Sequence, residues 1–410
     1  MRLRTHGLFE DGAMKVLILC GVFAPENEQE VIRHARRVVE FSANTFQKRL
    51  IEGFRRSGQD VQVISAPFIG SFPNGSDLVS FRKFSGEQDS YRYVGFNNIW
   101  GIRNISRSIS VKRAIRDFIR LEDADKCIVV YSAHSPFIEA ARYAKRRDSR
   151  IRVCMYFPDL PHYMNMSADR SPLYDTVKRF DIAHMLRDMD CADAFVLLTE
   201  QMKDLLPVKG KPCLIREGII DEIPEGPAPA SRGKDIVYTG KLEAAFGVAA
   251  LLEAFRKISD PQCRLVLCGR GDCEKQILRM AQEDPRIQFC GQVTPEQARQ
   301  IQLSAGVLVN PRPDSGEYTK YSFPSKNVEY LLTGRPVAAC MLSGMPEAYR
   351  DFVYEIKGDT PEAIAGALTA ALEDTEENCR LRYENFLAYA REHLMAGSIA
   401  RSIAEMCGKN

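Results

Sequence analysis

Residues 15–21 read KVLILCG, a short run of apolar side chains that ends in a glycine. A strand that is apolar on both faces is typical of a parallel sheet covered by helices on both sides. A helical pattern follows at 43–57, and a second strand, VQVI, follows at Val61–Ile64. This β-α-β opening predicts a doubly wound α/β sheet at the start of the chain.

The alternation of strands and helices runs through the whole chain, with one interruption. Glu222–Lys234 (EIPEGPAPASRGK) is rich in proline and poor in apolar residues, which is typical of a linker. We therefore predict an N-terminal Rossmann-like domain at 14–221, a linker at 222–234 and a second Rossmann-like domain at 235–385. A C-terminal helix at 386–410 is expected to pack back on the first domain. Further strands are predicted at 127–131, 151–157, 194–198, 213–216, 236–238, 264–268, 287–290, 307–310, 337–340 and 353–356.

Composition narrows the class of protein. The chain has 410 residues and a net charge of only +2, but residues 1–220 carry +7 and residues 221–410 carry −5. This balance argues against a nucleic-acid binder. No apolar run is long enough to cross a membrane, and residues 1–13 lack the apolar stretch of a signal peptide. We expect a cytoplasmic protein with reduced, buried cysteines, whose start is either Met1 or Met14.

The stretch 309–350 combines a strand end, a polar loop and a helix start. Pro324 and Ser325 suit the first positions of a helix, and Ser325 is expected to cap it. A helix start attracts an anion, which would offset the unfavourable position of Lys326 in the first turn. The Glu329 carboxylate lies on the same face and suits the paired hydroxyls of a ribose. The alternative is a surface ion pair between Lys326 and Glu329.

The sequence SFPSKNVEYLLTGRPV at Ser322–Val337 resembles the donor-binding motif of retaining glycosyltransferases of the family 4 type. It is most similar to the bacterial polysaccharide-biosynthesis members. The stretches YTGKLEAAFG at 238–247 and LCGRGD at 267–272 resemble further parts of that family's C-terminal domain. The resemblance implies the GT-B fold, in which two Rossmann-like doubly wound domains face each other across a cleft.

The resemblance also implies a role for individual residues in holding a nucleotide-sugar, most readily a UDP-sugar. Lys241 and Lys326 would contact the diphosphate, and Glu329 would hold the ribose. Arg312 would meet phosphate or sugar. Gly21 would let the backbone approach the phosphates, or it is an ordinary tight turn. The remaining residues implied to border the base, sugar or phosphates are Gly269, Gly291, Tyr321, Ser322, Phe323, Pro324 and Ser325.

Two positions depart from the family pattern. Tyr321 stands where the family has the first of two glutamates, and Glu317 lies four residues too early to replace it. Phe246 stands where a lysine is common, and we expect Lys326 to take over that role.

Two polar residues follow strands of the N-terminal domain and are the candidate catalytic residues. Asp159 could accept the proton of an acceptor hydroxyl, or it could stabilise its own turn before Pro161. His134 follows another predicted strand and could act beside Asp159, or it could be a hydrogen-bonded structural residue.

No metal or other cofactor is expected. The Asp123–Asp125 and Asp188–Asp190 triplets have the D-x-D pattern, but we interpret both as solvated ends of loops or helices. Lysines and a helix dipole would neutralise the diphosphate instead.

The stretch 99–121 is basic and amphipathic. Its apolar residues, with Trp100 beside them, could contact an anionic membrane surface. The alternative is a helix that packs in the core and exposes a basic face.

We therefore expect a glycosyltransferase of the hexosyltransferase type. It would pass a sugar to a saccharide acceptor, in particular a lipid-linked one, in exopolysaccharide or other cell-surface polysaccharide assembly at the inner face of the cytoplasmic membrane. Two alternatives remain: another GT-B enzyme such as a nucleotide-sugar epimerase, and a non-catalytic scaffold that binds a nucleotide-sugar.

Overall fold

The computed structural model describes residues 14–23, 25–36, 41–82, 84–85, 90–122, 125–163, 172–225 and 233–408. The chain forms two compact units: unit 1 consists of Met1–Asp221 with His393–Asn410, and unit 2 is Glu222–Glu392. The alternative start at Met1, most of the predicted linker and part of the Asp123–Asp125 triplet lie outside the described residues.

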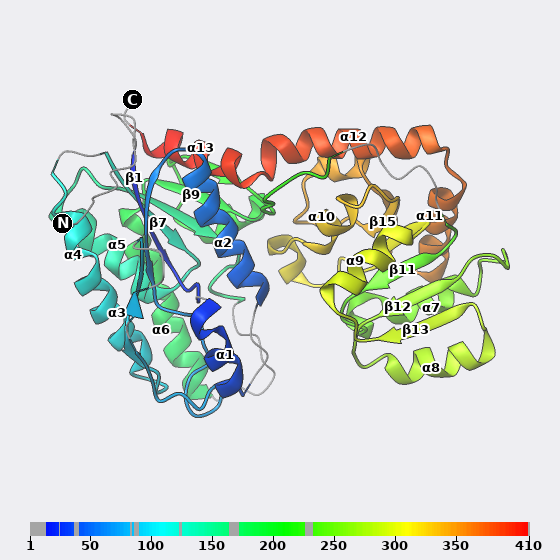
Figure 1. Ribbon diagram of the computed structural model, residues 1–410, viewed down its shortest axis with the longest axis horizontal. Coiled ribbons are helices and arrows are strands. Elements are labelled where there is room, and N and C mark those ends of the chain that lie inside the picture. The colour runs from blue at the N-terminus through cyan, green and yellow to red at the C-terminus, as the bar shows by residue number, and fades with distance from the viewer. Residues whose placement is uncertain are drawn as a thin grey trace, which may run out of the picture. The chain divides into compact units, whose positions relative to one another are not determined.

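Unit 1 contains an eight-stranded sheet in the order β10-β9-β8-β7-β1-β2-β5-β4 (Figure 1). All neighbours are parallel except β4 and β5. The strands are β1 (Lys15–Cys20), β2 (Asp60–Ser65), β4 (Phe84–Ser85), β5 (Tyr91–Tyr93), β7 (Lys126–Tyr131), β8 (Arg152–Phe157), β9 (Ala194–Leu197) and β10 (Cys213–Ile215). A separate antiparallel pair joins β3 (Ser80–Phe81) to β6 (Phe96–Asn97). The six predicted strands form, whereas β3 to β6, each of which has two or three residues including a polar one, were not predicted.

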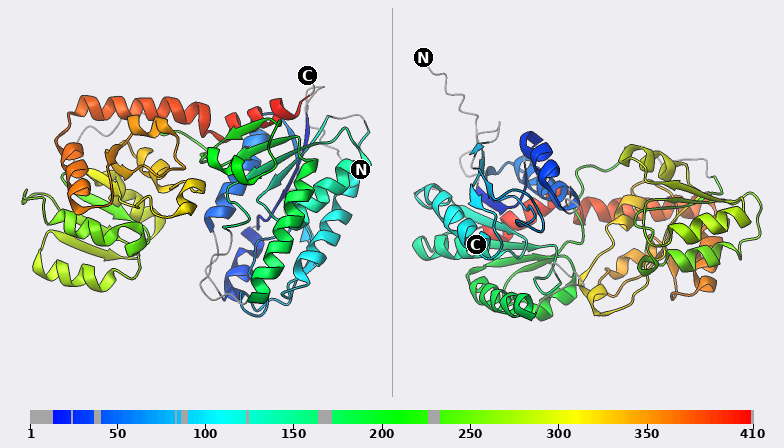
Figure 2. Two further views of the ribbon diagram at one scale, coloured as in Figure 1. Left: turned by 180° about the vertical axis from the view of Figure 1, so that it is seen from behind. Right: turned by 90° about the horizontal axis from the view of Figure 1, so that it is seen from below.

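Helices cover both faces of this sheet (Figures 1 and 2). The helix α2 (Phe41–Arg56) packs with α13 (Ala396–Cys407) on one face. The helices α3 (Arg103–Ala114), α5 (Ser135–Arg147) and α6 (Pro172–Asp188) pack together on the other. Two shorter helices are α1 (Pro25–His34) and α4 (Arg116–Ile119).

The contact between α2 and α13 is close because α2 has a glycine at the crossing point. A Cβ atom on Gly53 would lie 2.4 Å from the Ala396 carbonyl oxygen. Around this point Leu50 and Phe54 of α2 and Ile399 and Ile403 of α13 share one apolar cluster with the sheet. The last helix of the chain is therefore part of the core of unit 1.

The chain passes between the units twice. Next to these passages the Ile220 N–H donates to the Leu394 carbonyl at 2.9 Å, and the Ala396 N–H donates to the Ile220 carbonyl at 2.9 Å. Arg49 of α2 adds an ion pair with Asp221 at 2.9 Å. Unit 2 is thus a continuous segment inserted between two parts of unit 1. The predicted single helical stretch at the C-terminus breaks here into α12 (Glu376–His393) and α13.

Unit 2 contains a fully parallel six-stranded sheet in the order β13-β12-β11-β14-β15-β16. All six predicted strands form: β11 (Ile236–Thr239), β12 (Leu265–Cys268), β13 (Ile287–Gly291), β14 (Val307–Asn310), β15 (Val337–Cys340) and β16 (Tyr354–Ile356). The helices α7 (Val248–Phe255), α8 (Glu274–Glu283) and α11 (Pro361–Glu373) share an apolar core with these strands. The helices α9 (Pro295–Ser304) and α10 (Lys326–Leu331) lead into β14 and β15.

The stretch 99–121 differs from the single amphipathic helix that the sequence predicts. It forms α3 and the one-turn α4, and its apolar residues divide between two sides. Val111 and Ile115 are buried, whereas Ile105 is 64% and Ile109 is 45% exposed. Arg107, expected on the basic surface, is buried. No helix in the described residues is long and apolar enough to span a membrane.

Candidate functional site

The strand order reverses once in each sheet, and open α/β sheets bind ligands beyond the carboxyl ends of the strands at such a point. In unit 2 the reversal lies at β11, which pairs with both β12 and β14. Gly240 and Lys241 follow β11, and Arg312 lies two residues after β14. In unit 1 the reversal lies at β1, between β2 and β7. Gly21 and His134 occupy the loops after β1 and β7.

Lys326 reaches from α10 to the end of β11. Its ammonium donates a hydrogen bond to the Thr239 carbonyl and lies 4.6 Å from the centre of the Tyr238 ring. Gly240 leaves space for it, because a Cβ atom there would lie 1.7 Å from Nζ. Burial lowers the pKa of Lys326 to about 8, although the Glu329 charge opposes the shift. Among the described residues no carboxylate pairs with this ammonium, so its charge is available to an anion.

Glu329 is held by a residue that the sequence did not single out. Gln302 of α9 is fully buried, and its Nε2 donates to Glu329 Oε1 at 2.6 Å. The same Nε2 donates to Thr239 Oγ1 at 2.9 Å. Tyr330 completes the group, because its hydroxyl donates to the Thr239 carbonyl at 3.1 Å. One strand, β11, and two helices, α9 and α10, thus fix the position of one exposed carboxylate.

Two expectations about the start of α10 are wrong. Ser325 does not cap the helix with its side chain, because its backbone is already helical at φ −50° and ψ −24°. Lys326 and Glu329 do not form the alternative surface ion pair either. Lys326 turns to Thr239 while Glu329 turns to Gln302. With only six residues, α10 contributes less through its dipole than the sequence suggests.

Arg312 lies in the loop after β14 between two aromatic rings. Its guanidinium carbon is 5.7 Å from the Phe246 ring centre and 5.6 Å from that of Tyr318. One guanidinium nitrogen donates to Ser322 Oγ at 3.2 Å. A cation therefore lies over the phenylalanine that departs from the family pattern. Lys326, which we expect to take over the role of the missing lysine, lies against Tyr238, and that role stays a prediction.

The segment Phe323–Ser325, which precedes Lys326, packs largely into unit 2. Phe323 is buried and meets the Tyr349 ring edge-on at 5.1 Å. Pro324 is buried, Ser325 is exposed, and Tyr321 is half-buried at the end of a short 3-10 helix, Glu317–Tyr321. This segment shapes the edge of the sheet and leaves Ser325 facing solvent.

Three strands end in glycines that lie against one another. A Cβ atom on Gly269 would lie 1.7 Å from the Gly240 carbonyl oxygen, and the Gly269 N–H donates to the Gly291 carbonyl at 2.7 Å. Gly291 itself borders open space. Lys241 is exposed, and its carbonyl accepts a hydrogen bond from the Tyr238 hydroxyl at 2.8 Å. The carboxyl ends of β11, β12 and β13 therefore present backbone atoms without side chains, next to the exposed Lys241.

At the edge of unit 1, Gly21 is needed for packing. A Cβ atom there would lie 2.3 Å from the Phe68 ring, and its N–H donates to Gln47 Oε1 at 2.7 Å. The group that lies closely against the Gly21 backbone in this structure is therefore the Phe68 ring.

His134 begins α5 and is held by a buried arginine. Arg107 Nη1 lies 3.3 Å from His134 Nε2, and its Nη2 donates to the Pro67 carbonyl at 2.6 Å. An arginine can only donate, so Nε2 accepts and the proton resides on Nδ1. Burial and the Arg107 charge lower the pKa of His134. His134 is therefore neutral, and its buried Nδ1 has no hydrogen-bond partner among the described residues.

Asp159 follows β8 and is exposed. Its charge acts on Tyr131 of β7, whose pKa is raised by burial and further by Asp159. The carboxylate therefore lies at the same sheet edge as the residues that follow β7.

The acidic and cysteine side chains are the candidates for metal binding and for thiol chemistry. Asp188 is not solvated as expected: it is 3% exposed and pairs with Arg142 at 2.7 Å. In the described parts of the chain, no three His, Cys, Asp or Glu side chains come together in a way that could hold a metal ion. In the part of the chain that the structure describes, no disulfide forms and most cysteines are buried, but Cys290 is exposed.

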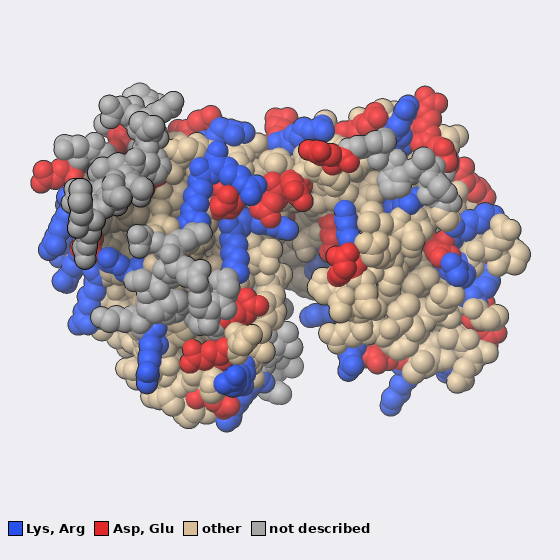
Figure 3. Space-filling model, viewed as in Figure 1, with Lys and Arg blue, Asp and Glu red and all other residues tan. Residues whose placement is uncertain are grey.

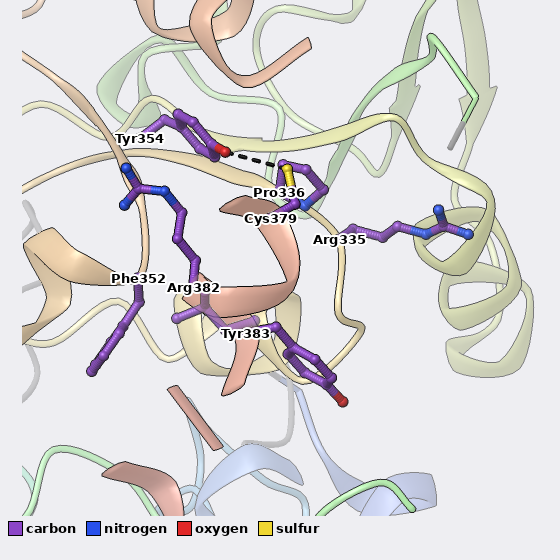
Figure 4. Close-up of a pocket in the computed structure, with 8 residues that line it drawn as sticks. Arg335, Pro336, Phe352, Tyr354, Cys379, Arg382 and Tyr383 are labelled. Carbon is purple, nitrogen blue, oxygen red and sulfur yellow. Dashed lines mark hydrogen bonds between the residues drawn. The ribbon is translucent and has the colours of Figure 1, made fainter. Parts of the chain in front are cut away.

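A pocket in unit 2 lies away from this site. Figure 4 shows Arg382 and Tyr383 of α12 lining it beside Tyr354, at the amino ends of β15 and β16. Ligands of such sheets bind at the opposite edge, so this pocket is not part of the candidate site.

Comparison with known proteins supports a candidate site in unit 2. Residues 233–374 match the model of the family Glycosyl transferases group 1. The matched segment lies within unit 2, which carries the candidate site. The chain is therefore a transferase enzyme, as the sequence predicts. No curated protein sequence matches the chain.

Solved glycosyltransferase structures share the fold over nearly the whole chain. HepE of Anabaena, in complex with UDP, has a TM-score of 0.59 at 14% identity, covering 96% of this chain and 99% of that one. The lipopolysaccharide outer core galactosyltransferase WaaB has a TM-score of 0.57 at 14% identity, covering 93% and 100%. An E. coli trehalose-6-phosphate protein bound with UDP-2-fluoro glucose has 0.62 at 11% identity, covering 97% and 100%. These similarities confirm the predicted GT-B fold, while the family 4 subgroup stays a prediction.

Proposed function

We propose that this glycosyltransferase takes a sugar from a nucleotide-sugar, in the first place a UDP-sugar, and passes it with retention of configuration to a saccharide acceptor. We further propose that the acceptor is lipid-linked and serves cell-surface polysaccharide assembly, as the family 4 resemblance implies. The observation that carries the proposal is the ammonium of Lys326, which pairs with no carboxylate of the described residues, beside the fixed carboxylate of Glu329 at the strand reversal of unit 2. Solved structures of the same fold contain UDP or a UDP-sugar analogue, which favours UDP.

Each residue would then have a distinct task. Lys326, Lys241 and Arg312 would bind the diphosphate and stabilise the charge that develops as it leaves. Glu329 would accept hydrogen bonds from the ribose hydroxyls. Because cationic side chains supply the neutralising charge, we expect transfer to continue in the presence of a metal chelator.

Unit 1 would bind the acceptor. Asp159 would accept the proton of the attacking hydroxyl, a task that the departing phosphate could share. His134 cannot be the base while Arg107 occupies its Nε2 and its proton lies on the buried Nδ1, so we assign it a structural role beside Arg107.

The test begins with titration of the purified protein with UDP, GDP and ADP, followed by assays of nucleotide release from the matching sugars. Glu329→Ala should abolish nucleotide binding, because the ribose ligand is lost. Asp159→Ala should spare binding and lower transfer about a hundredfold or more, at the low end of what general base catalysis supplies, ~10²–10⁴. The exposed carboxylates Glu296 and Asp190 provide matched alanine controls.

The alternatives give different results in the same assays. Binding without transfer to any acceptor would indicate a scaffold, and conversion of the sugar without acceptor would indicate an epimerase. A protein that binds none of the three nucleotides would contradict the proposal.

We also propose peripheral contact with an anionic membrane through the exposed side of α3. This isoleucine face consists of Ile99, Trp100, Ile102, Ile105 and Ile109, which are 38–64% exposed. Lys and Arg side chains lie along the edge of unit 1 that carries α3 and α4 (Figure 3). Apolar side chains ringed by cations suit the interface of a bilayer with acidic lipids.

Sedimentation with vesicles of phosphatidylcholine and phosphatidylglycerol tests this contact. Trp100→Ala with Ile105→Asp should lower the bound fraction about tenfold or more, since burying one large apolar side chain is worth ~1.5–3 kcal/mol. Leu278→Asp, at an exposed leucine of α8 in unit 2, is the matched control. Equal binding of the variant and the wild type would exclude the isoleucine face.

A further inference from the structure

Gln302 is a buried polar side chain for which packing alone gives no reason. It lies on α9 with 0% exposure, at a position where an apolar residue would serve the core. Within the described parts of the chain its Oε1 has no hydrogen-bond partner, so keeping the amide costs free energy. What the amide does provide is two hydrogen bonds from Nε2, one to Thr239 Oγ1 at 2.9 Å and one to Glu329 Oε1 at 2.6 Å.

The direction of these hydrogen bonds can be assigned from the donors available. Tyr330 uses its single proton on the Thr239 carbonyl, so the Thr239 hydroxyl donates to Tyr330 across 3.2 Å. Thr239 Oγ1 is then an acceptor for Gln302. A carboxylate also can only accept, so the amide must present nitrogen, and not oxygen, to both neighbours. The network therefore fixes the orientation of the Gln302 amide.

This chain of hydrogen bonds joins the two charged groups of the site. It runs from Glu329 through Gln302 and Thr239 to Tyr330, and Lys326 donates to the same Thr239 carbonyl. Glu329 is an exposed side chain that would otherwise sample several rotamers. One buried donor holds it at a set distance from the end of β11.

We propose that Gln302 is a positioning residue, which orients the Glu329 carboxylate toward the ribose hydroxyls of the donor nucleotide. The proposal rests on the proposed function, since it assigns Glu329 to the ribose. Gln302 itself touches no substrate. Its effect should therefore appear only with nucleotides whose ribose carries the hydroxyls that Glu329 binds.

The test compares a nucleotide with its 2′,3′-dideoxy analogue. UDP, GDP and ADP are first titrated with the wild type by calorimetry, and the one that binds is paired with its dideoxy form. Gln302→Met, which removes both hydrogen bonds at similar volume, should weaken binding of the nucleotide about tenfold. Binding of the dideoxy form should change less than twofold. The matched control is Gln300→Met, because Gln300 lies on the same helix and its exposed amide also donates to a carboxylate, Glu296, at 3.0 Å.

Two further variants keep the test decisive. Gln302→Leu removes the same two hydrogen bonds with a smaller apolar side chain, and should show the same selective loss if Gln302→Met does not fold. Adding Gln302→Met to Glu329→Gln should weaken nucleotide binding no further than Glu329→Gln does alone. Equal loss for both nucleotides, or no loss for either, would overturn the positioning role and leave the proposed function intact. A wild type that binds no nucleoside diphosphate would overturn the proposed function instead.

Discussion

At the scale of single residues, Lys326 shows how burial sets the working range of a cation. Its ammonium has a carbonyl and an aromatic ring as neighbours, and burial lowers its pKa to about 8. A bound diphosphate would favour the charged form and raise that pKa again. Because the pKa of Lys326 is lower in the folded chain than in the unfolded chain, the residue costs stability below pH 8. The free energy of unfolding should recover as the pH rises above that value.

The same shift predicts the pH dependence of nucleotide binding. Binding of the diphosphate requires the protonated lysine, so the dissociation constant should rise about tenfold per pH unit above pH 8, as for uptake of one proton. Calorimetric titrations between pH 7.5 and 9.5 avoid the second ionisation of the terminal phosphate, at about pH 6. Lys326→Arg, whose charge persists throughout, should remove the slope. Equal slopes in the two proteins would show that another group titrates.

Individual residues also show where sequence reasoning ends. The placement of Lys326 and Glu329 near the carboxyl edge of the unit 2 sheet could be predicted. The alternation of strands and helices shows that the loop between β14 and α10 leaves the sheet at that edge. Gln302 and Thr239 could not, because their pairing depends on the side-by-side packing of α9, β11 and α10. Arg107 was misplaced for the same reason: a basic residue in a basic segment gives no sign that it bonds to His134.

At the scale of elements, the strands that fall in an apolar stretch of sequence were predicted, including the three-residue β10 and β16, whereas β3 to β6 were not. The strands β3 to β6 have two or three residues each, and each includes a polar residue. The segment 99–121 has apolar residues on two sides of its helices, so a single apolar face was the wrong interpretation. Helix-to-helix contacts such as that of α2 with α13 join residues far apart in the chain, which no local pattern encodes.

Two helical glycines give opposite predictions at this scale. Gly53→Ala should lower the free energy of unfolding, because its Cβ would meet the Ala396 carbonyl of α13 at 2.4 Å. Gly366→Ala in α11, where no atom lies within 4 Å of the added Cβ, should raise the free energy of unfolding by ~0.5–1 kcal/mol through helix propensity. Urea unfolding of both variants measures the difference. Stabilisation by Gly53→Ala would contradict the close packing of α2 on α13.

At the scale of the whole molecule, the two units depend on different parts of the chain. Ile403 of α13 is fully buried in unit 1, although it follows the whole of unit 2 in sequence. Ile403→Asp should destabilise unit 1 by several kcal/mol, because a charge is buried without a partner. Hydrogen–deuterium exchange should then rise in α2, β7 and β8 while unit 2 keeps its protection. Arg401→Asp, at an exposed position of the same helix, is the control. Loss of protection throughout unit 2 would show that the units unfold together.

The insertion of unit 2 into unit 1 also sets an order for events during synthesis. Unit 2 is one continuous segment and can fold once residue 392 has left the ribosome. The sheet of unit 1 emerges earlier, yet the face that receives α13 stays uncovered until residues 396–407 are made. Synthesis proceeds at ~5–20 residues per second, so that face lacks α13 for roughly ten seconds or more. During this interval the nascent chain exposes an apolar surface that is complementary to its own last helix, and this is the stage at which chaperone binding would matter most.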